Sequence, residues 1–197
     1  MATNVTGMKR VQDQLALLAH TDALTGLPNR NHLYRRLTEA IARSHRNGTK
    51  LGFLYLDLDN FKQINDTLGY AGGDELLKQF GTRLQACVRQ TDMVARLAGD
   101  EFVIVIESME QSEEAQRVAA KIIGAMQSPF TLAGTDRFIT TSVGVATADV
   151  QTENPDSLIR KADEALYQAK RSGKNLYRLY DTLDVAGHEM KPDQREK

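Results

Sequence analysis

The chain of 197 residues is long enough for one sizeable domain with short extensions. Its 25 lysines and arginines nearly balance 26 aspartates and glutamates, so it lacks the basic excess typical of proteins that bind nucleic acid. The single cysteine, Cys87, excludes an internal disulfide and is typical of a reducing compartment. No apolar run approaches the ~18 residues of a membrane span, so we expect a cytoplasmic domain without direct membrane insertion.

The N-terminal segment, residues 1–20, carries apolar residues at Met8, Val11, Leu15 and Leu18. This three-four-three spacing is typical of a coiled coil, but it lasts only about two heptads, which is too short to be stable alone. Two interpretations stay open. The segment is either an ordinary helix that packs on the domain or the stub of a dimeric signalling helix that an upstream sensor domain controls.

Residues 21–30 are rich in turn-forming and helix-capping residues, so the first helix must end there. Beyond them, apolar periodicity and turn residues predict alternating helices and strands. The expected helices cover residues 31–45, 73–88, 112–126 and 155–171, and the expected strands cover 51–56, 94–97, 102–106, 130–132, 137–146 and 175–180. Because two hairpins interrupt the alternation, we predict an α+β fold, a mixed sheet flanked by helices, over residues 21–180. The polar residues 181–197 are expected to form a tail or linker.

Acidic residues stand at the edges of two apolar strands. Asp57 follows the strand over 51–56, and Asp100 and Glu101 occupy the tight turn before the strand over 102–106. If the two strands are neighbours, these carboxylates meet at one end of the sheet and suit Mg²⁺, a hard cation that prefers oxygen ligands. The four histidines show no zinc-ligand spacing. Either acidic cluster alone is more often a solvated turn, but the pair favours a metal site.

Four motifs resemble those of one family. Arg96-Leu97-Ala98-Gly99-Asp100-Glu101-Phe102 resembles the signature of GGDEF domains, the diguanylate cyclases. The segments 22–30, 57–69 and 162–175 are similar to the start, the metal and nucleotide segment and the last helix of that domain, in the same order. The resemblance covers nearly the whole chain. It implies a central, largely antiparallel five-stranded sheet like the palm of nucleotidyl cyclases.

The resemblance also implies roles for individual residues. Asp57 and Asp100 would bind Mg²⁺, or Mn²⁺ in its place, through their side chains, and Leu58 through its carbonyl oxygen. Glu101 would act beside Asp100 by binding metal or assisting proton transfer. The guanine edge would be recognised by Asn65 and Asp74, whose groups match its donors and acceptors. The triphosphate would be held by the backbone amides of Asn60, Phe61 and Lys62 and by the side chains of Lys170 and Lys174.

A second ligand site is implied before the catalytic turn. Arg89 and Asp92 have the placement of the family's product-inhibition site, and Lys121 on the following helix would supply another cation. The alternative is a helix that ends in an arginine, followed by an aspartate that opens the next strand.

The activity implied is the condensation of two GTP molecules into cyclic di-GMP and two pyrophosphates by a homodimer of half-sites. One departure is Ala98, which stands where the family has its first glycine. If that position has a positive φ, alanine costs about 1 kcal/mol of strain. The alternative function is therefore a silent receptor of GTP or cyclic di-GMP that regulates a sensor or effector domain in a longer protein.

Overall fold

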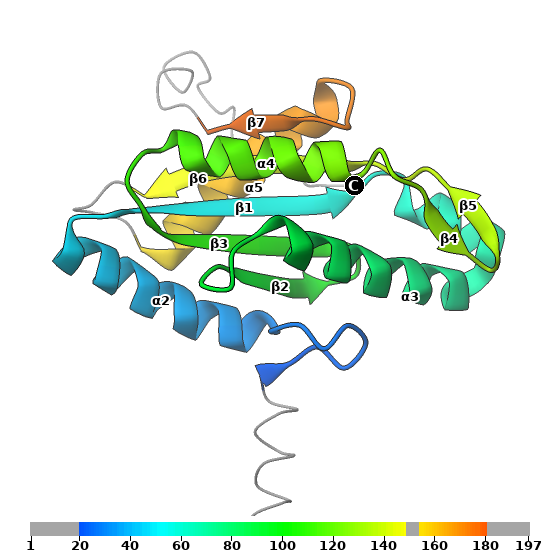
Figure 1. Cartoon of the computed structure of the whole chain (residues 1–197), viewed down its shortest axis with the longest axis horizontal. Coiled ribbons are helices and arrows are strands. Elements are labelled where there is room, and N and C mark those ends of the chain that lie inside the picture. The colour runs from blue at the N-terminus through cyan, green and yellow to red at the C-terminus, as the bar shows by residue number, and fades with distance from the viewer. Residues whose placement is uncertain (1–19, 149–153, 181–197) are drawn as a thin grey trace, which may run out of the picture.

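The computed structural model describes residues 20–148 and 154–180. Its elements in chain order are α2 (Arg30–Asn47), β1 (Lys50–Leu58), α3 (Phe61–Cys87), β2 (Met93–Ala98), β3 (Glu101–Met109), α4 (Glu113–Ala125), β4 (Phe130–Leu132), β5 (Thr135–Arg137), β6 (Thr141–Ala148), α5 (Pro155–Arg171) and β7 (Tyr177–Leu179). Figure 1 shows the helices arranged around one central sheet. The predicted segments 1–20 and 181–197 lie outside the described residues, except for His20.

The central sheet has five strands in the order β2-β3-β1-β6-β7. β1 is antiparallel to both β3 and β6, β2 is antiparallel to β3, and only the β6–β7 pair is parallel. The prediction of a mixed, largely antiparallel five-stranded sheet is therefore confirmed. β1 lies at the centre, which explains why its sequence is apolar on both faces.

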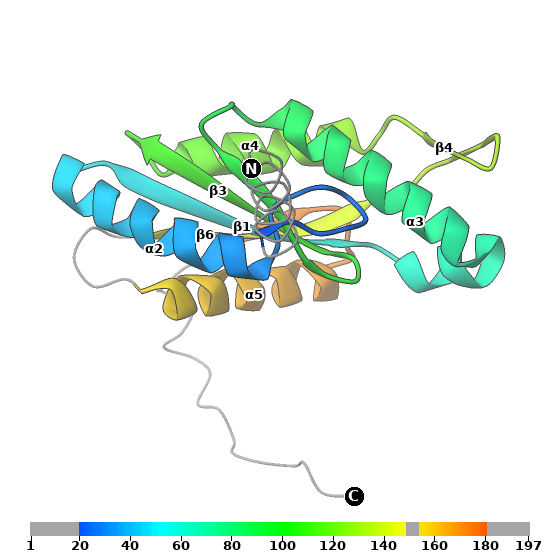
Figure 2. The same ribbon diagram turned by 90° about the horizontal axis from the view of Figure 1, so that it is seen from below.

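Helices cover both faces of the sheet, with α3 and α4 on one side and α2 and α5 on the other (Figure 2). Side chains of β1 alternate between the two layers: Leu54 and Leu56 pack with α3 and α4, and Phe53 and Tyr55 pack with α2 and α5. Asp57 continues the second series. It therefore points to the α2/α5 face, at the end of the strand.

Two predicted boundaries were wrong. The helix expected from residue 73 begins at Phe61, and Gly69, with φ 72° and ψ 176°, separates its two halves. Glycines at 69, 72 and 73 hid the first half, because glycine is a poor helix former. The strand expected over 137–146 is two strands: β5 pairs with β4 in a separate hairpin, and β6 belongs to the central sheet.

Gly144 of β6 provides a test of the packing. A Cβ atom there would collide with the backbone of α5 at Ala162 and Leu166, which cannot move without displacing the helix. Gly144→Ala is expected to lower the free energy of unfolding by about 3 kcal/mol, measured by urea denaturation. Gly124→Ala is the matched control: open space surrounds Gly124 in α4, so alanine should stabilise by about 0.5 kcal/mol. Equal stability of Gly144→Ala and the wild type would contradict the close approach of α5 to β6.

In the part of the chain that the structure describes, no helix is both long and apolar enough to cross a membrane.

Candidate active site

Two carboxylates face each other across the central strands. Asp57 of β1 is the direct cross-strand partner of Glu101 of β3, and both side chains lie on the α2/α5 face of the sheet. Like charges directly opposite each other destabilise a sheet unless a cation lies between or beside them. Lys170 of α5 supplies one, since its Nζ lies 2.7 Å from Asp57 Oδ2.

Asp100 lies in the turn between β2 and β3, next to Glu101. Burial raises the pKa of Asp100, and the neighbouring charge of Glu101 adds to the rise. Burial also raises the pKa of Asp57; the hydrogen bond from Lys170 opposes this rise, and the charge of Asp100 increases it. The charge of Asp100 thus disfavours the ionisation of Asp57, and the charge of Glu101 disfavours that of Asp100; a bound cation would reverse both effects.

The donor set suits a hard divalent cation through oxygen atoms alone. Within residues 20–148 and 154–180, however, no three His, Cys, Asp or Glu side chains gather as a preformed metal cluster. Asp57 and Asp100 with the backbone carbonyl of Leu58 therefore form an incomplete set. A metal held here would need further oxygen ligands from a nucleotide or water.

Asp59 is a structural carboxylate that the sequence did not reveal. It is 5% exposed, and its Oδ1 accepts a hydrogen bond from Ser142 Oγ at 2.7 Å. Its Oδ2 accepts from Thr140 Oγ1 at 2.6 Å and from the Asn175 amide at 3.0 Å. The end of β1 is thereby tied to the start of β6 and to the segment after α5. The apolar strand that ends in two aspartates two residues apart was the available signal.

The two predicted phosphate-binding lysines reach the same edge of the sheet. Lys170 pairs with Asp57, and Lys174 Nζ donates to Asn60 Oδ1 at 2.8 Å. Lys174 and Asn175 both have left-handed backbones, with φ 63° and 51°, which turn the chain back after α5. Asn60 is also left-handed, at φ 59°, and precedes the N-terminus of α3.

The first turn of α3 presents backbone amides beside these lysines. Asn60 makes no side-chain capping hydrogen bond, so the N-terminus that includes Phe61 and Lys62 keeps donors for an anion. Farther along, the kink at Gly69 folds the first half of α3 toward the second. The Asn65 side chain lies against Gly73, the residue before Asp74.

Ala98 carries no backbone strain. It ends β2, it is exposed, and it is absent from the described residues with a positive φ, whereas Gly99 has φ 50°. The left-handed position of the turn thus falls on Gly99. The strain considered for alanine does not arise.

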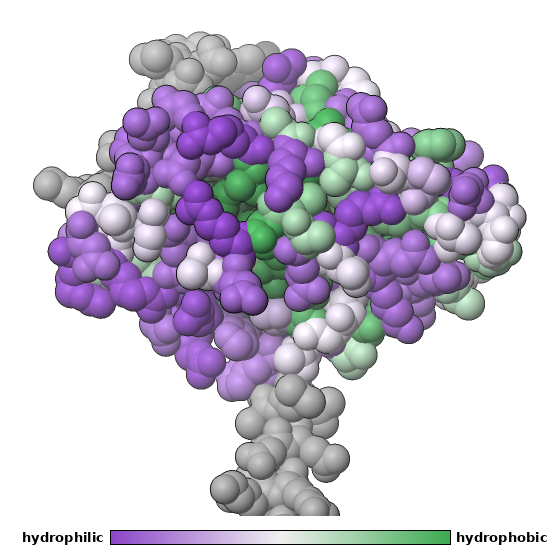
Figure 3. All heavy atoms as spheres, in the orientation of Figure 1, coloured by the Kyte–Doolittle hydropathy of each residue, from purple (hydrophilic) through white to green (hydrophobic). Residues whose placement is uncertain are grey.

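A cavity of about 240 Å³ lies beside the end of α3 and contains both predicted inhibition-site residues. It is lined by Cys87, Val88, Arg89, Asp92, Ile106, Glu114, Arg117, Val118 and Lys121. On the face of the molecule seen in Figure 3, hydrophobic residues lie in the middle and hydrophilic residues surround them.

The charged residues that line this cavity differ in the contacts they make. Arg89 contacts Glu114 at 3.2 Å, and the Asp92 Oδ2 accepts from the Arg89 amide at 3.0 Å. The other oxygen, Asp92 Oδ1, is buried. Lys121 donates to the Cys87 carbonyl at 3.0 Å, so its charge stabilises the end of α3. Arg117, which the sequence did not single out, is a further cation that lines the cavity.

Comparisons with known proteins agree with this geometry. The family model "Diguanylate cyclase, GGDEF domain" matches residues 19–176. Diguanylate cyclase TpbB of Pseudomonas aeruginosa (strain PAO1) is 37% identical over 179 residues, 89% of this chain and 41% of TpbB. Cyclic di-GMP phosphodiesterase PdeR of Escherichia coli (strain K12) is 35% identical over 178 residues, 90% of this chain and 26% of PdeR. The chain thus spans about a quarter to two fifths of the length of these curated relatives.

Solved structures of GGDEF domains are also similar to this chain. The GGDEF domain of TpbB has a TM-score of 0.81 at 36% identity, covering 85% of this chain and 98% of that chain. The coiled coil and GGDEF domain of DgcB from Caulobacter crescentus, in complex with c-di-GMP, has a TM-score of 0.79 at 27% identity, covering 89% and 93%. The resemblance stated from the sequence is confirmed, and the chain belongs to the GGDEF domain family.

Proposed function

We propose that this chain is an active diguanylate cyclase that condenses two GTP molecules into cyclic di-GMP and two pyrophosphates with Mg²⁺. The observation that carries the proposal is that acidic residues of β1 and of the β2–β3 turn lie at the same edge of the sheet as two lysines. Asp57, Glu101 and Asp100 lie there with Lys170 and Lys174, beside the N-terminus of α3. Such a set supplies oxygen ligands for a metal and cationic and amide donors for phosphates.

Each group has a defined task in this proposal. The amides of Asn60, Phe61 and Lys62 bind phosphate oxygens, and Lys170 exchanges its contact with Asp57 for the triphosphate. Asp57, Asp100 and the Leu58 carbonyl hold the metal. The metal held there would lower the pKa of the attacking 3′-hydroxyl and offset charge on the leaving pyrophosphate.

One domain supplies one half-site, so we propose that catalysis takes place between two copies of the chain. Each copy orients one GTP through Asn65 and Asp74, and the two nucleotides lie antiparallel with each 3′-hydroxyl near the α-phosphate of the other. Bringing the two reactants together is then itself a large part of the rate enhancement.

The second candidate function is a silent receptor of GTP or cyclic di-GMP. The name of PdeR motivates it, since a cyclic di-GMP phosphodiesterase contains a segment similar to this chain. Incubation with GTP and Mg²⁺ separates the two functions. The cyclase yields cyclic di-GMP and pyrophosphate, whereas the receptor binds nucleotide and leaves GTP intact.

Product feedback is a further part of the proposal. The cavity beside the end of α3 would bind cyclic di-GMP, with Arg89 holding a phosphate and the Asp92 carboxylate accepting from a guanine. Because Lys121 is engaged with the Cys87 carbonyl, Arg117 is the better candidate for the second cation.

Arg89→Ala is expected to raise the product concentration for half-inhibition by roughly ten- to a hundredfold, the usual cost of losing a charge-assisted partner. Initial rates without product should stay within about twofold, because Arg89 contacts no substrate in the proposal. The measurement is initial velocity against added cyclic di-GMP, with Arg46→Ala, an exposed arginine of α2, as the control. Identical inhibition curves for Arg89→Ala and the wild type would assign Arg89 and Asp92 to an ordinary helix end.

A further inference from the structure

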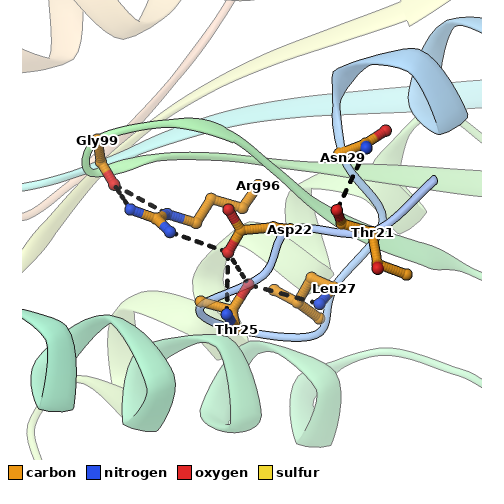
Figure 4. Close-up of polar contacts among 7 residues, drawn as sticks. All are labelled: Thr21, Asp22, Thr25, Leu27, Asn29, Arg96 and Gly99. Carbon is orange, nitrogen blue, oxygen red and sulfur yellow. Dashed lines mark hydrogen bonds and ion pairs between the residues drawn. The ribbon is translucent and has the colours of Figure 1, made fainter. Parts of the chain in front are cut away.

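An ion pair connects the entry loop of the domain to the catalytic turn (Figure 4). Asp22 Oδ1 accepts hydrogen bonds from the amide and the hydroxyl of Thr25, at 2.9 and 2.7 Å, and from Arg96 at 2.9 Å. The same guanidinium donates twice to the carbonyl of Gly99, at 3.0 Å from Nε and 2.7 Å from Nη2. One planar group thus holds a carboxylate and a turn carbonyl in fixed relation.

The loop side of this bridge is firmly anchored. The Asp22 amide donates to the Leu27 carbonyl at 2.7 Å, which closes the loop on itself. Leu27 is 2% exposed and belongs to the core beneath α3. The backbone of the loop also attaches to β2, because the Arg96 amide donates to the Pro28 carbonyl at 3.0 Å. These contacts hold the backbone around Asp22 in place against the core and β2.

The turn side has few other supports. Gly99 has a left-handed backbone, and no atom outside its chain neighbours comes within 4 Å of where its Cβ would be. The pairing of β2 with β3 is interrupted by a bulge between Arg96 and Ala98. The Arg96 side chain is 10% exposed, but its hydrogen bonds to the Gly99 carbonyl lie at the exposed surface of the turn.

We propose that Asp22 and Arg96 are positioning residues for the catalytic turn. By fixing the Gly99 carbonyl, they set the direction in which the next residues, Asp100 and Glu101, carry their carboxylates. Burial alone would raise the pKa of Asp22, but the hydrogen bonds from Thr25 and Arg96 lower it overall, so the pair stays charged at neutral pH. The inference rests on the proposed function, because it assigns the turn a catalytic task.

Hydrogen–deuterium exchange of the free chain tests the bridge without any need for activity. In Arg96→Met the amides of residues 98–101 should exchange roughly ten- to a hundredfold faster, the cost of losing hydrogen bonds to a charged group. Arg96→Lys should lie between Arg96→Met and the wild type, since lysine lacks the fork that reaches Asp22 and Gly99 together.

Steady-state kinetics test the positioning role itself. Arg96→Met should lower kcat by roughly a hundredfold, the cost of a small misplacement of catalytic groups, and change KM by less than about threefold. Because Asp22 acts through Arg96, the double variant Asp22→Asn/Arg96→Met should be no worse than Arg96→Met alone.

The matched control is Arg43→Met. Arg43 also makes two hydrogen bonds to one partner, Glu107, at 3.1 and 2.7 Å, but it does so on α2, away from the turn. The Arg43→Met variant should have a lower melting temperature than the wild type, with unchanged kcat and unchanged hydrogen–deuterium exchange of the turn amides.

Three results would overturn the proposal: unchanged turn exchange in Arg96→Met, faster exchange that Arg43→Met reproduces, or strictly additive effects in the double variant. Absence of cyclic di-GMP from the wild type would reject the proposed function instead, and the exchange experiment would still decide whether the bridge orders the turn.

Discussion

Asp100→Asn is expected to lower kcat by about a thousandfold or more, because in the proposed mechanism it removes a charge that would hold the metal where negative charge develops in the transition state. The loss should be accompanied by weaker Mg²⁺ dependence, measured as the metal concentration for half-maximal rate. The matched control is Asp156→Asn, which removes an exposed carboxylate at the N-terminus of α5, at the opposite end of that helix from Lys170.

The same variant should not unfold the domain. The pKa of Asp100 is raised in the folded chain, chiefly by burial, so the folded state binds the proton more tightly than the unfolded state. The ionised carboxylate therefore costs stability at neutral pH, above both pKa values. Asp100→Asn should leave the melting temperature unchanged or slightly higher. A variant with wild-type turnover would reject Asp100 as a metal ligand, and a large fall in melting temperature would reject the electrostatic account of the turn.

GTP is expected to be preferred to ATP by about a thousandfold or more in kcat/KM. A site that forms hydrogen bonds to particular groups of its substrate discriminates against analogues that lack those groups, by up to roughly 10⁴–10⁵ in kcat/KM. In the proposed site, Asp74 would accept from the N1 and N2 protons of guanine, which adenine lacks in that arrangement, and Asn65 would donate and accept in one plane. Comparable initial rates with the two nucleotides would show that these residues do not recognise the base.

The assignment to Asp74 has its own control. Asp74→Ala should lower kcat/KM for GTP by roughly a hundredfold and leave the slow rate with ATP unchanged, so that most of the preference is lost. Asp66→Ala removes another exposed carboxylate from the same helix and should preserve the preference. Equal losses in the two variants would indicate a general effect of charge on nucleotide binding.

The features that could be predicted from the sequence were those indicated by residues close together in the chain. β1 and the turn at Asp100 were predictable because an apolar strand that ends in a carboxylate needs a partner for the charge. The prediction that Asp57 and Asp100 meet at one end of the sheet required the two strands to be neighbours, and β1 and β3 are paired. The resemblance to the family brought in Lys170 and Lys174, which the structure places at the same edge.

The features that were missed depend on residues far apart in the chain. Asp59 bonds to Thr140 and Asn175, which lie 81 and 116 residues away, and Asp22 lies 74 residues from Arg96. The spacing of residues in the sequence does not indicate which distant residues will form such hydrogen bonds. The first half of α3 was missed for a different reason: the glycines at 69, 72 and 73 indicate a break, and a separate helical half precedes the break at Gly69.

The most direct test of the proposed cyclase is its specific activity as a function of chain concentration, with GTP and Mg²⁺ in excess. If two half-sites must meet, cyclic di-GMP formed per chain rises in proportion to concentration in the dilute range and levels off once dimers dominate. Two pyrophosphates should accompany each cyclic di-GMP. A specific activity independent of concentration through the dilute range would contradict the account of two half-sites that must meet. GTP that binds without any turnover at the highest concentration would contradict the cyclase and favour the receptor.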